Sequence, residues 1–284
     1  MTLRDGRRLQ YFEQGHPKGQ IILYIHSLID GVEFPEIFSR GLVRSGLRII
    51  SPSRAGFGRS EPNRKSNIID LVDSCVSDMI NLLDHINAEE VIVLSGWAGS
   101  IAQRLALRDT GRVKSLIFSG AVPVWENHYL NFLSDRDRIA VKTSIHAPQA
   151  LPYLVRVKKA MQTSQDHSIF MGSLDKSNLQ KKHLSHYEKI YLKKKFHHIL
   201  NQSVWALIED LPYIHKDWTD DARKLDLPVT IVKGEDNIDQ PPEAITRYKT
   251  AVPHAIVRII NRAGSNELLE YFGEFLDVFE NYRK

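Results

Sequence analysis

The chain has 284 residues, of which 42% are hydrophobic and 25% charged, and its formal net charge is +4 at pH 7. This composition is that of a folded soluble protein, and the length suits one large domain or a domain that carries an insertion. A disulfide-rich fold is excluded because Cys75 is the single cysteine, and we interpret it as a packing residue of a helix.

The chain gives no sign of targeting to a membrane or of binding nucleic acid. The first ten residues contain no apolar signal-peptide core, and no apolar stretch approaches the roughly 18 residues of a membrane span. The basic runs, such as 193–195, are expected to be solvated helix faces, and no helix-turn-helix, zinc-binding or RNA-binding motif is present. We therefore expect a cytoplasmic protein with no nucleic-acid partner.

Apolar runs alternate with amphipathic stretches along the chain. The predicted elements, in order, are a strand at 21–25, a helix at 32–45, a strand at 47–51, a helix at 67–86, a strand at 91–94, a helix at 101–107 and a strand at 113–119. Further on follow a strand at 229–233, a helix at 243–251, a strand at 256–260 and a last helix at 267–282. Such alternation predicts an α/β protein with a mainly parallel sheet covered by helices on both faces.

Between residues 123 and 218 the alternation stops, and the chain is mostly helical in character, with prolines at Pro148 and Pro152. This stretch is too long for a connection inside a compact sheet. We interpret it as a helical cap at 123–218, inserted into a core formed by residues 1–122 and 219–284. A cap in this position is expected to lie over the carboxyl ends of the strands, where ligands bind in open α/β sheets.

Several short motifs occur in a characteristic order along the chain. They are Asp5-Gly6 with Leu9 and Tyr11, Ile25-His26-Ser27, the turn from Ser53 to Ser60 with glycines at 56 and 58, Leu227-Pro228-Val229 through Gly234-Glu235-Asp236, and Ala263-Gly264-Ser265. Together they resemble the capped α/β hydrolases, whose turn Asp-x-x-Gly-x-Gly-x-Ser is matched by residues 53–60. A dinucleotide-binding loop is not favoured, because the third glycine of that fingerprint falls at Glu61. We expect no cofactor.

The resemblance places Trp97 where the family has its nucleophile. The segment Ser95-Gly96-Trp97-Ala98-Gly99 matches the strand-to-helix elbow, with small residues two before and two after the central position. An indole has no hydroxyl or thiol with which to form an acyl-enzyme. A bulky residue in a strained turn also costs about 1–3 kcal/mol, so either the turn relaxes or packing of the indole offsets the strain.

The acid and base positions are changed as well. The acid position is Asn237, whose amide carries no charge to stabilise an imidazolium, and the base position is Ser265, whose hydroxyl is no general base near neutral pH. Asp236 or Asp239 would replace the acid only if the loop shifted, and His254 precedes the last strand, at the wrong end of the sheet. Loss of all three positions predicts a catalytically degenerate hydrolase.

Three residues remain as fallback catalytic candidates: Ser100, Ser95 and His26. Ser100 is expected in the first turn of the following helix with its hydroxyl capping backbone donors. Ser95 stands in for a small packing residue of the elbow, and His26 is interpreted as a structural residue of its loop. Of the cap histidines 183, 186, 197 and 198, a pair spaced by three can share a helix face, but without a third ligand we expect no metal site.

The resemblance also suggests a binding site. The backbone donors of Leu28 and Ala98 match the oxyanion hole of the family, although Ser27 replaces its glycine. The expected ligand-binding residues are His26, Ser27, Leu28, Trp97, Ala98 and Ser265, and the aromatic residues expected to face them from the cap are Trp125, Tyr129, Phe132, Tyr153, Phe170 and Trp205.

Two functions follow from these residues. The first is a non-catalytic domain that binds a small apolar or acyl molecule, or a protein partner, in a sensing or regulatory role. The alternative is a hydrolase, esterase-like, whose nucleophile has moved to Ser100 or Ser95. Either is compatible with a homo-oligomer, and the sequence does not identify the ligand.

Overall fold

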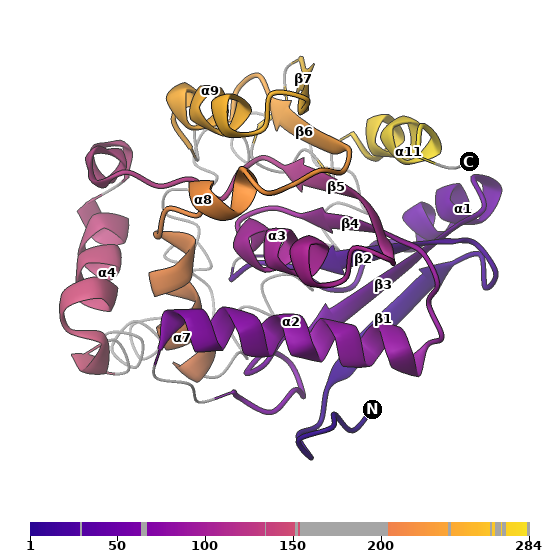
Figure 1. Cartoon of the computed structure of the whole chain (residues 1–284), viewed down its shortest axis with the longest axis horizontal. Helices are drawn as coiled ribbons and strands as arrows, with labels where there is room; N and C mark the ends of the chain where they lie inside the picture. The colour runs from indigo at the N-terminus through magenta and orange to yellow at the C-terminus, as the bar shows by residue number, and fades with distance from the viewer. Residues whose placement is uncertain are drawn as a thin grey trace, which may run out of the picture.

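The computed structural model describes residues 1–28, 30–63, 67–133, 135–150, 153, 204–237, 240–261, 263–264, 268 and 271–282. Its strands form one seven-stranded sheet in the order β1-β3-β2-β4-β5-β6-β7 (Figure 1). The strands are β1 Gln10–Gly15, β2 Gln20–Ile25, β3 Leu47–Ser53, β4 Val91–Ser95, β5 Val113–Ser119, β6 Val229–Gly234 and β7 Ile256–Ile260. Only β1 is antiparallel to its neighbour, so the predicted α/β class with a mainly parallel sheet is confirmed.

The central strands are apolar on both sides because helices cover both faces of the sheet. Along β4, Val91 and Val93 join one buried cluster, and Ile92 and Leu94 join the other. This division follows from the alternation of side chains along a strand. It explains why the sequences of these strands are continuously apolar and do not alternate between apolar and polar residues.

Helices from different parts of the chain make up the two outer layers. The described helices outside the long insertion are α1 Glu36–Arg44, α2 Ile68–His85, α3 Gly99–Arg108, α8 Thr219–Ala222, α9 Pro242–Ala251 and α11 Phe272–Glu280. Apolar residues of α2, α3, α8 and α9 lie in one cluster, and those of α1 and α11 lie in the other. Figure 1 shows α2 and α3 in front of the strands. The rings of Phe38 on α1 and Phe272 on α11 stack with their centroids 3.8 Å apart.

The first helix is shorter than the sequence pattern predicts. It begins at Glu36, after Pro35 in an extended conformation, and not at residue 32. The backbone of Phe34 is bound instead by the side chain of Gln14, which donates to its carbonyl oxygen at 3.1 Å and accepts from its N–H at 3.0 Å. A side chain from β1 therefore satisfies backbone groups that a helix would have used.

The described part of the segment at 123–218 combines helices with coil and turn residues, such as 123–126 and 215–218. It contains η1 Asn127–Phe132, α4 Asp135–His146, η2 Pro148–Ala150 and α7 Val204–Ile214. α7 contacts both α4 and α2, so the insertion is joined to the core (Figure 1). Of the helices described here, none has the length and apolar character needed to cross a membrane.

The second helix and the C-terminal helical region bury the residues that their sequences predict. Cys75 is buried among the apolar residues of α2, and burial raises the pKa of its thiol. Leu268, Phe272, Phe275 and Phe279, the apolar series of the last helix, are all buried. Helical periodicity thus identified the buried faces, although the helix ends differ by a few residues.

The start of α2 gives a first prediction. The Asn67 side chain accepts a hydrogen bond from the N–H of Ile69 at 2.8 Å and caps the helix. We expect Asn67→Ala to lower the free energy of unfolding by about 1 kcal/mol, measured by urea denaturation. Asn67→Asp retains an acceptor and should stay close to the parent; an equal loss in both variants would contradict the capping role.

Candidate functional site

The site lies at the carboxyl edge of the sheet, where β4 turns into α3. Gly96 and Gly99 let this turn close, because a Cβ atom on Gly96 would lie 2.9 Å from the Ser119 carbonyl oxygen and one on Gly99 would lie 2.9 Å from Phe118. The Ser95 hydroxyl donates to the Ile25 carbonyl oxygen at 2.9 Å and is fully buried. The small residues thus occupy the expected elbow positions, and Ser95 ties β4 to β2.

Trp97 occupies the tip of this turn without backbone strain. Among the described residues other than glycine, only Asn87 has a positive φ, so Trp97 lies outside the left-handed region. A nucleophile elbow normally holds its central residue in a strained conformation. The elbow has therefore relaxed, which decides between the two outcomes that the sequence left open.

The turn after β6, which leads to the predicted acid position, lies beside Ala263 and Gly264, which precede the predicted base position. The Asp236 N–H donates to the Ala263 carbonyl oxygen at 2.9 Å. Asn237 is buried, with 4% of its surface exposed, whereas Asp236 is exposed and does not replace it. Ser265 and Asp239 lie outside the described residues.

The close approach of these turns gives a second prediction. A Cβ atom on Gly234 would lie 2.3 Å from the Ala263 carbonyl oxygen, a backbone atom that cannot easily move. We expect Gly234→Ala to lower the free energy of unfolding by about 1–3 kcal/mol in a urea titration. Gly273→Ala is the matched control: apart from its chain neighbours and the backbone of its own helix, no described atom lies within 4 Å of its added Cβ in α11. This variant should therefore be unchanged or slightly stabilised. Similar losses in both would contradict the steric argument.

Both ring nitrogens of His26 form hydrogen bonds with backbone groups. Its Nε2 accepts a hydrogen bond from the Arg54 N–H at 3.0 Å, so Nδ1 carries the proton and donates to the Ser27 carbonyl oxygen at 2.9 Å. The ring is fully buried and meets the Phe57 ring edge to face, with centroids 4.7 Å apart. This geometry suits the loop-fixing role that the sequence analysis gave His26.

The loop after β2 carries the other expected binding residues. The Ser27 N–H and hydroxyl both donate to one carboxylate oxygen of Asp30, at 2.9 and 2.7 Å, so the residue that replaces the family glycine stabilises the turn. Leu28 and Ala98 follow neighbouring strands, since Ile25 pairs with Ser95. Neither the Leu28 nor the Ala98 N–H donates to another described residue.

Ser100, the main fallback nucleophile, differs from its expected role. It lies in the first turn of α3, but its hydroxyl caps nothing and has no hydrogen-bond partner in the part of the chain that the structure describes. Only 1% of its surface is exposed. A buried hydroxyl without a partner is unusual, but at this burial a substrate has no direct access to it.

A family model described as alpha/beta hydrolase fold matches residues 20–270. The chain belongs to this family. A thermophilic esterase from Thermogutta terrifontis has a similar structure, with 17% sequence identity, a TM-score of 0.70 and a match over 99% of this chain and 95% of that chain. A bromoperoxidase from Bacillus anthracis has 20% identity and a TM-score of 0.68, over 97% of this chain and 95% of that chain. An enol-lactonase from Burkholderia xenovorans LB400 has 12% identity and a TM-score of 0.67, over 98% of this chain and 97% of that chain. At these identities they support the fold alone.

In this α/β hydrolase an aromatic cluster faces the elbow. His215, directly after α7, meets Trp125 edge to face at 4.5 Å between centroids and has its centroid 6.5 Å from that of Trp97. Tyr129 in turn meets Trp125 edge to face at 5.7 Å. Of the aromatic residues expected to face the site from the cap, Trp125 and Tyr129 are buried, whereas Phe132 and Tyr153 are exposed, which contradicts the expectation for these two.

The remaining cap predictions fall outside what the structure describes. This applies to Phe170, the side chain of Trp205 and the histidines at 183, 186, 197 and 198. Within the described residues, no group of three histidine, cysteine or acidic side chains is placed to hold a metal ion. His254 Nε2 lies 3.0 Å from the carbonyl oxygen of Leu227, which precedes β6. His254 is therefore at the end of the sheet away from the elbow, as predicted.

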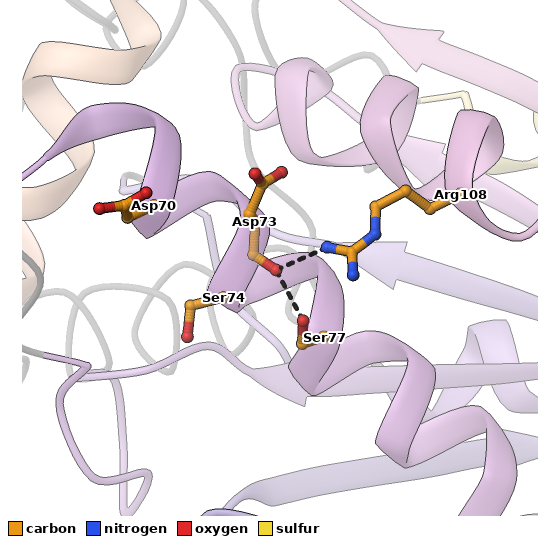
Figure 2. Close-up of a pocket in the computed structure, with 5 residues that line it drawn as sticks. All are labelled: Asp70, Asp73, Ser74, Ser77 and Arg108. Carbon is orange, nitrogen blue, oxygen red and sulfur yellow. Dashed lines mark hydrogen bonds between the residues drawn. The ribbon is translucent and has the colours of Figure 1, made fainter.

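A surface groove of about 510 Å³ lies elsewhere on the molecule, between α2 and α3 (Figure 2). It is lined by Asp70, Asp73, Ser74, Ser77 and Arg108. Ser77 Oγ and Arg108 both donate to the Asp73 carbonyl oxygen, at 2.9 and 3.2 Å. Arg108 is the last residue of α3, at the helix end away from Trp97, so the groove is no part of the elbow site.

Sequence reasoning missed one pair of charged residues at the site. Arg54 and Asp210 form a buried ion pair, with 2% and 3% of their side chains exposed. Burial alone would lower the pKa of Arg54, but the carboxylate of Asp210 raises it above its ordinary value. The available signal was the charged pair Glu209-Asp210 inside the apolar run of a helix, where a charged side chain is buried only if it is paired.

Proposed function

We propose that this protein is a non-catalytic α/β hydrolase that binds a small apolar or acyl ligand beside Trp97, in a sensing or regulatory role. The observation that carries the proposal is the indole at the relaxed elbow, where the family has its nucleophile. The nearest alternative groups are in structural use: the Ser95 hydroxyl holds Ile25, and both ring nitrogens of His26 are bonded. Without a nucleophile and a base, the usual acyl transfer has no first step.

The chemistry of the surroundings supports a ligand of this class. Trp97, Trp125 and Tyr129 offer aromatic surface, and the N–H groups of Leu28 and Ala98 offer donors for a carbonyl or carboxylate oxygen. We propose further that the segment at 123–218 caps this site. His215, which belongs to that segment, is already beside Trp97.

The test combines turnover with binding. The parent protein should give no hydrolysis of p-nitrophenyl acetate or octanoate above the uncatalysed rate, and no label from a fluorophosphonate probe. Octanoate or decanoate should raise its melting temperature in a concentration-dependent way, because a ligand of the folded state stabilises it. Turnover by the parent would overturn the proposal.

The alternative is a hydrolase with an unconventional site; an esterase and an enol-lactonase are among the proteins that share its fold. Its specific support is the hydroxyl of Ser100, three residues beyond Trp97, which bonds to no residue among those described. Turnover and probe labelling that are both abolished by Ser100→Ala, but retained in Ser95→Ala, would establish it.

A further inference from the structure

One helix, α7, contacts the site at two separate points. α7 packs against α2 (Figure 1). Its residues Glu209 and Asp210 are buried although both are acidic. Asp210 lies in the middle of the helix, and His215 follows its last residue, Ile214. The first contact is with the turn after β3, and the second is with the elbow.

The first contact is the Arg54–Asp210 pair. The Arg54 guanidinium donates to both carboxylate oxygens of Asp210, to Oδ1 at 2.9 Å and to Oδ2 through its second terminal nitrogen. The guanidinium also lies over the rings of Phe57 and Tyr213, 4.8 and 5.8 Å from their centroids. A charge in such apolar surroundings depends on its partner, so Arg54 keeps this position only while α7 is docked.

Arg54 in turn fixes the loop after β2. Its Nε donates to the His26 carbonyl oxygen at 2.6 Å, and its backbone N–H donates to His26 Nε2 at 3.0 Å. His26 is followed directly by Ser27 and Leu28, whose N–H is one of the two donors of the proposed binding site. A movement of α7 would therefore change the position of the Leu28 N–H through the contacts of Asp210 with Arg54 and of Arg54 with His26.

The second contact is with the aromatic residues. The Nδ1 atom of His215 lies 2.7 Å from the Leu211 carbonyl oxygen, which fastens the ring to the last turn of α7. The same ring meets Trp125 and lies beside Trp97. An apolar ligand that enters between Trp97 and Trp125 has to displace the His215 ring, and with it the end of α7.

We infer that α7 is the element that couples the ligand site to the loop carrying the Leu28 donor, with Asp210 and Arg54 as its positioning residues. The inference rests on the proposed function where it names a ligand as the cause of the movement. The mechanical coupling between the two contacts exists in the free protein and is testable there. A ligand bound beside Trp97 moves α7, and α7 in turn moves Arg54 and the His26 loop.

The test introduces a change at one contact and observes the other. The protein is labelled with 5-fluorotryptophan, and the resonance of residue 97 among the four tryptophans is assigned with Trp97→Phe. Asp210→Asn keeps the shape of the side chain and removes its charge. We expect it to shift or broaden the Trp97 resonance, and to increase hydrogen exchange in a peptide that spans residues 20–30.

The matched control is Asp78→Asn, because Asp78 is also a buried carboxylate bound to both terminal nitrogens of an arginine, Arg7. It should leave the Trp97 resonance unchanged. His215→Ala tests the coupling from the other end and leaves the Arg54–Asp210 pair in place. It should increase exchange in the same 20–30 peptide, which also covers the case in which Asp210→Asn fails to fold.

The outcomes separate the two claims. An unchanged Trp97 resonance in a folded Asp210→Asn variant, unchanged exchange at 20–30 in His215→Ala, or an equal shift in Asp78→Asn would overturn the coupling. Ester turnover by the parent would overturn the proposed function and would leave these spectra unaffected.

Discussion

Restoring all three triad positions is expected to create esterase activity that no single replacement creates. The triple variant Trp97→Ser, Asn237→Asp, Ser265→His should hydrolyse p-nitrophenyl acetate, whereas the parent and Trp97→Ser alone stay at the uncatalysed rate. A serine hydroxyl without a base remains protonated and is a weak nucleophile. A positioned general base contributes about 10²–10⁴-fold, so the triple variant should exceed Trp97→Ser by at least about a hundredfold.

The fold supports this expectation because the described residues that lead to the three positions meet at one edge of the sheet. β4, which leads to Trp97, and β6, which leads to Asn237, both pair with β5 in parallel. The hydrogen bond from Asp236 to Ala263 joins the acid and base turns. The relaxed backbone at Trp97 should limit the recovered rate, because the elbow no longer holds its central residue in the strained conformation.

A fluorophosphonate adduct located by mass spectrometry provides the decisive control. The adduct is expected at position 97 in the triple variant and at no residue of the parent. Labelling of the parent at Ser100 or Ser95 would show that the nucleophile has moved and that the non-catalytic interpretation is wrong. Asn237→Asp with Ser265→His, without the serine, should remain inactive and so excludes catalysis by the introduced histidine alone.

The parallel sheet was predictable because buried parallel strands are apolar on both faces. The ranges 113–119 and 256–260 agree with β5 and β7 at both ends. Helix ends were less predictable, since they depend on tertiary partners as well as on local signals. The hydrogen bonds from Gln14 hold Phe34 outside α1. Pro35 is the local signal for this start, because the residue before a proline avoids the helical conformation. Periodicity reports which face is buried, not where long-range hydrogen bonds begin.

The site was predictable where it follows strand ends and unpredictable where it depends on the insertion. The elbow, the Asn237 turn and the His26 loop are placed by the strands that precede them. The approach of His215 to Trp97 joins residues more than a hundred positions apart in the chain, and no local pattern specifies it. The Arg54–Asp210 pair was unpredictable for the same reason, because in the sequence each partner is simply a charged residue in a turn or on a helix.

Removing one partner of that pair is expected to produce the largest loss of stability among single substitutions at the site. Asp210→Ala leaves the Arg54 guanidinium buried and uncompensated, because Phe57, Tyr213 and the backbone of His26 surround it. Breaking a buried ion pair in this way costs about 3–5 kcal/mol. The measurement is the free energy of unfolding from urea denaturation, with the slope compared between variants.

The double variant Arg54→Met, Asp210→Leu distinguishes the charge from the packing. It removes both charges and retains much of the apolar volume, so its stability should lie much closer to that of the parent than to that of Asp210→Ala. Asp70→Ala is the exposed control and should change stability by no more than about 0.5 kcal/mol. A double variant as unstable as Asp210→Ala would mean that Arg54 contributes mainly through its hydrogen bonds to His26.

If the double variant is stable, stability does not explain why this chain has an ion pair where an apolar pair would serve. What Met and Leu cannot supply is the hydrogen bond from Arg54 Nε to the His26 carbonyl oxygen. The double variant should therefore be folded but show faster hydrogen exchange at residues 20–30 than the parent. Exchange equal to that of the parent would show that the β2 loop holds its position without Arg54, and that the pair does not position the binding site.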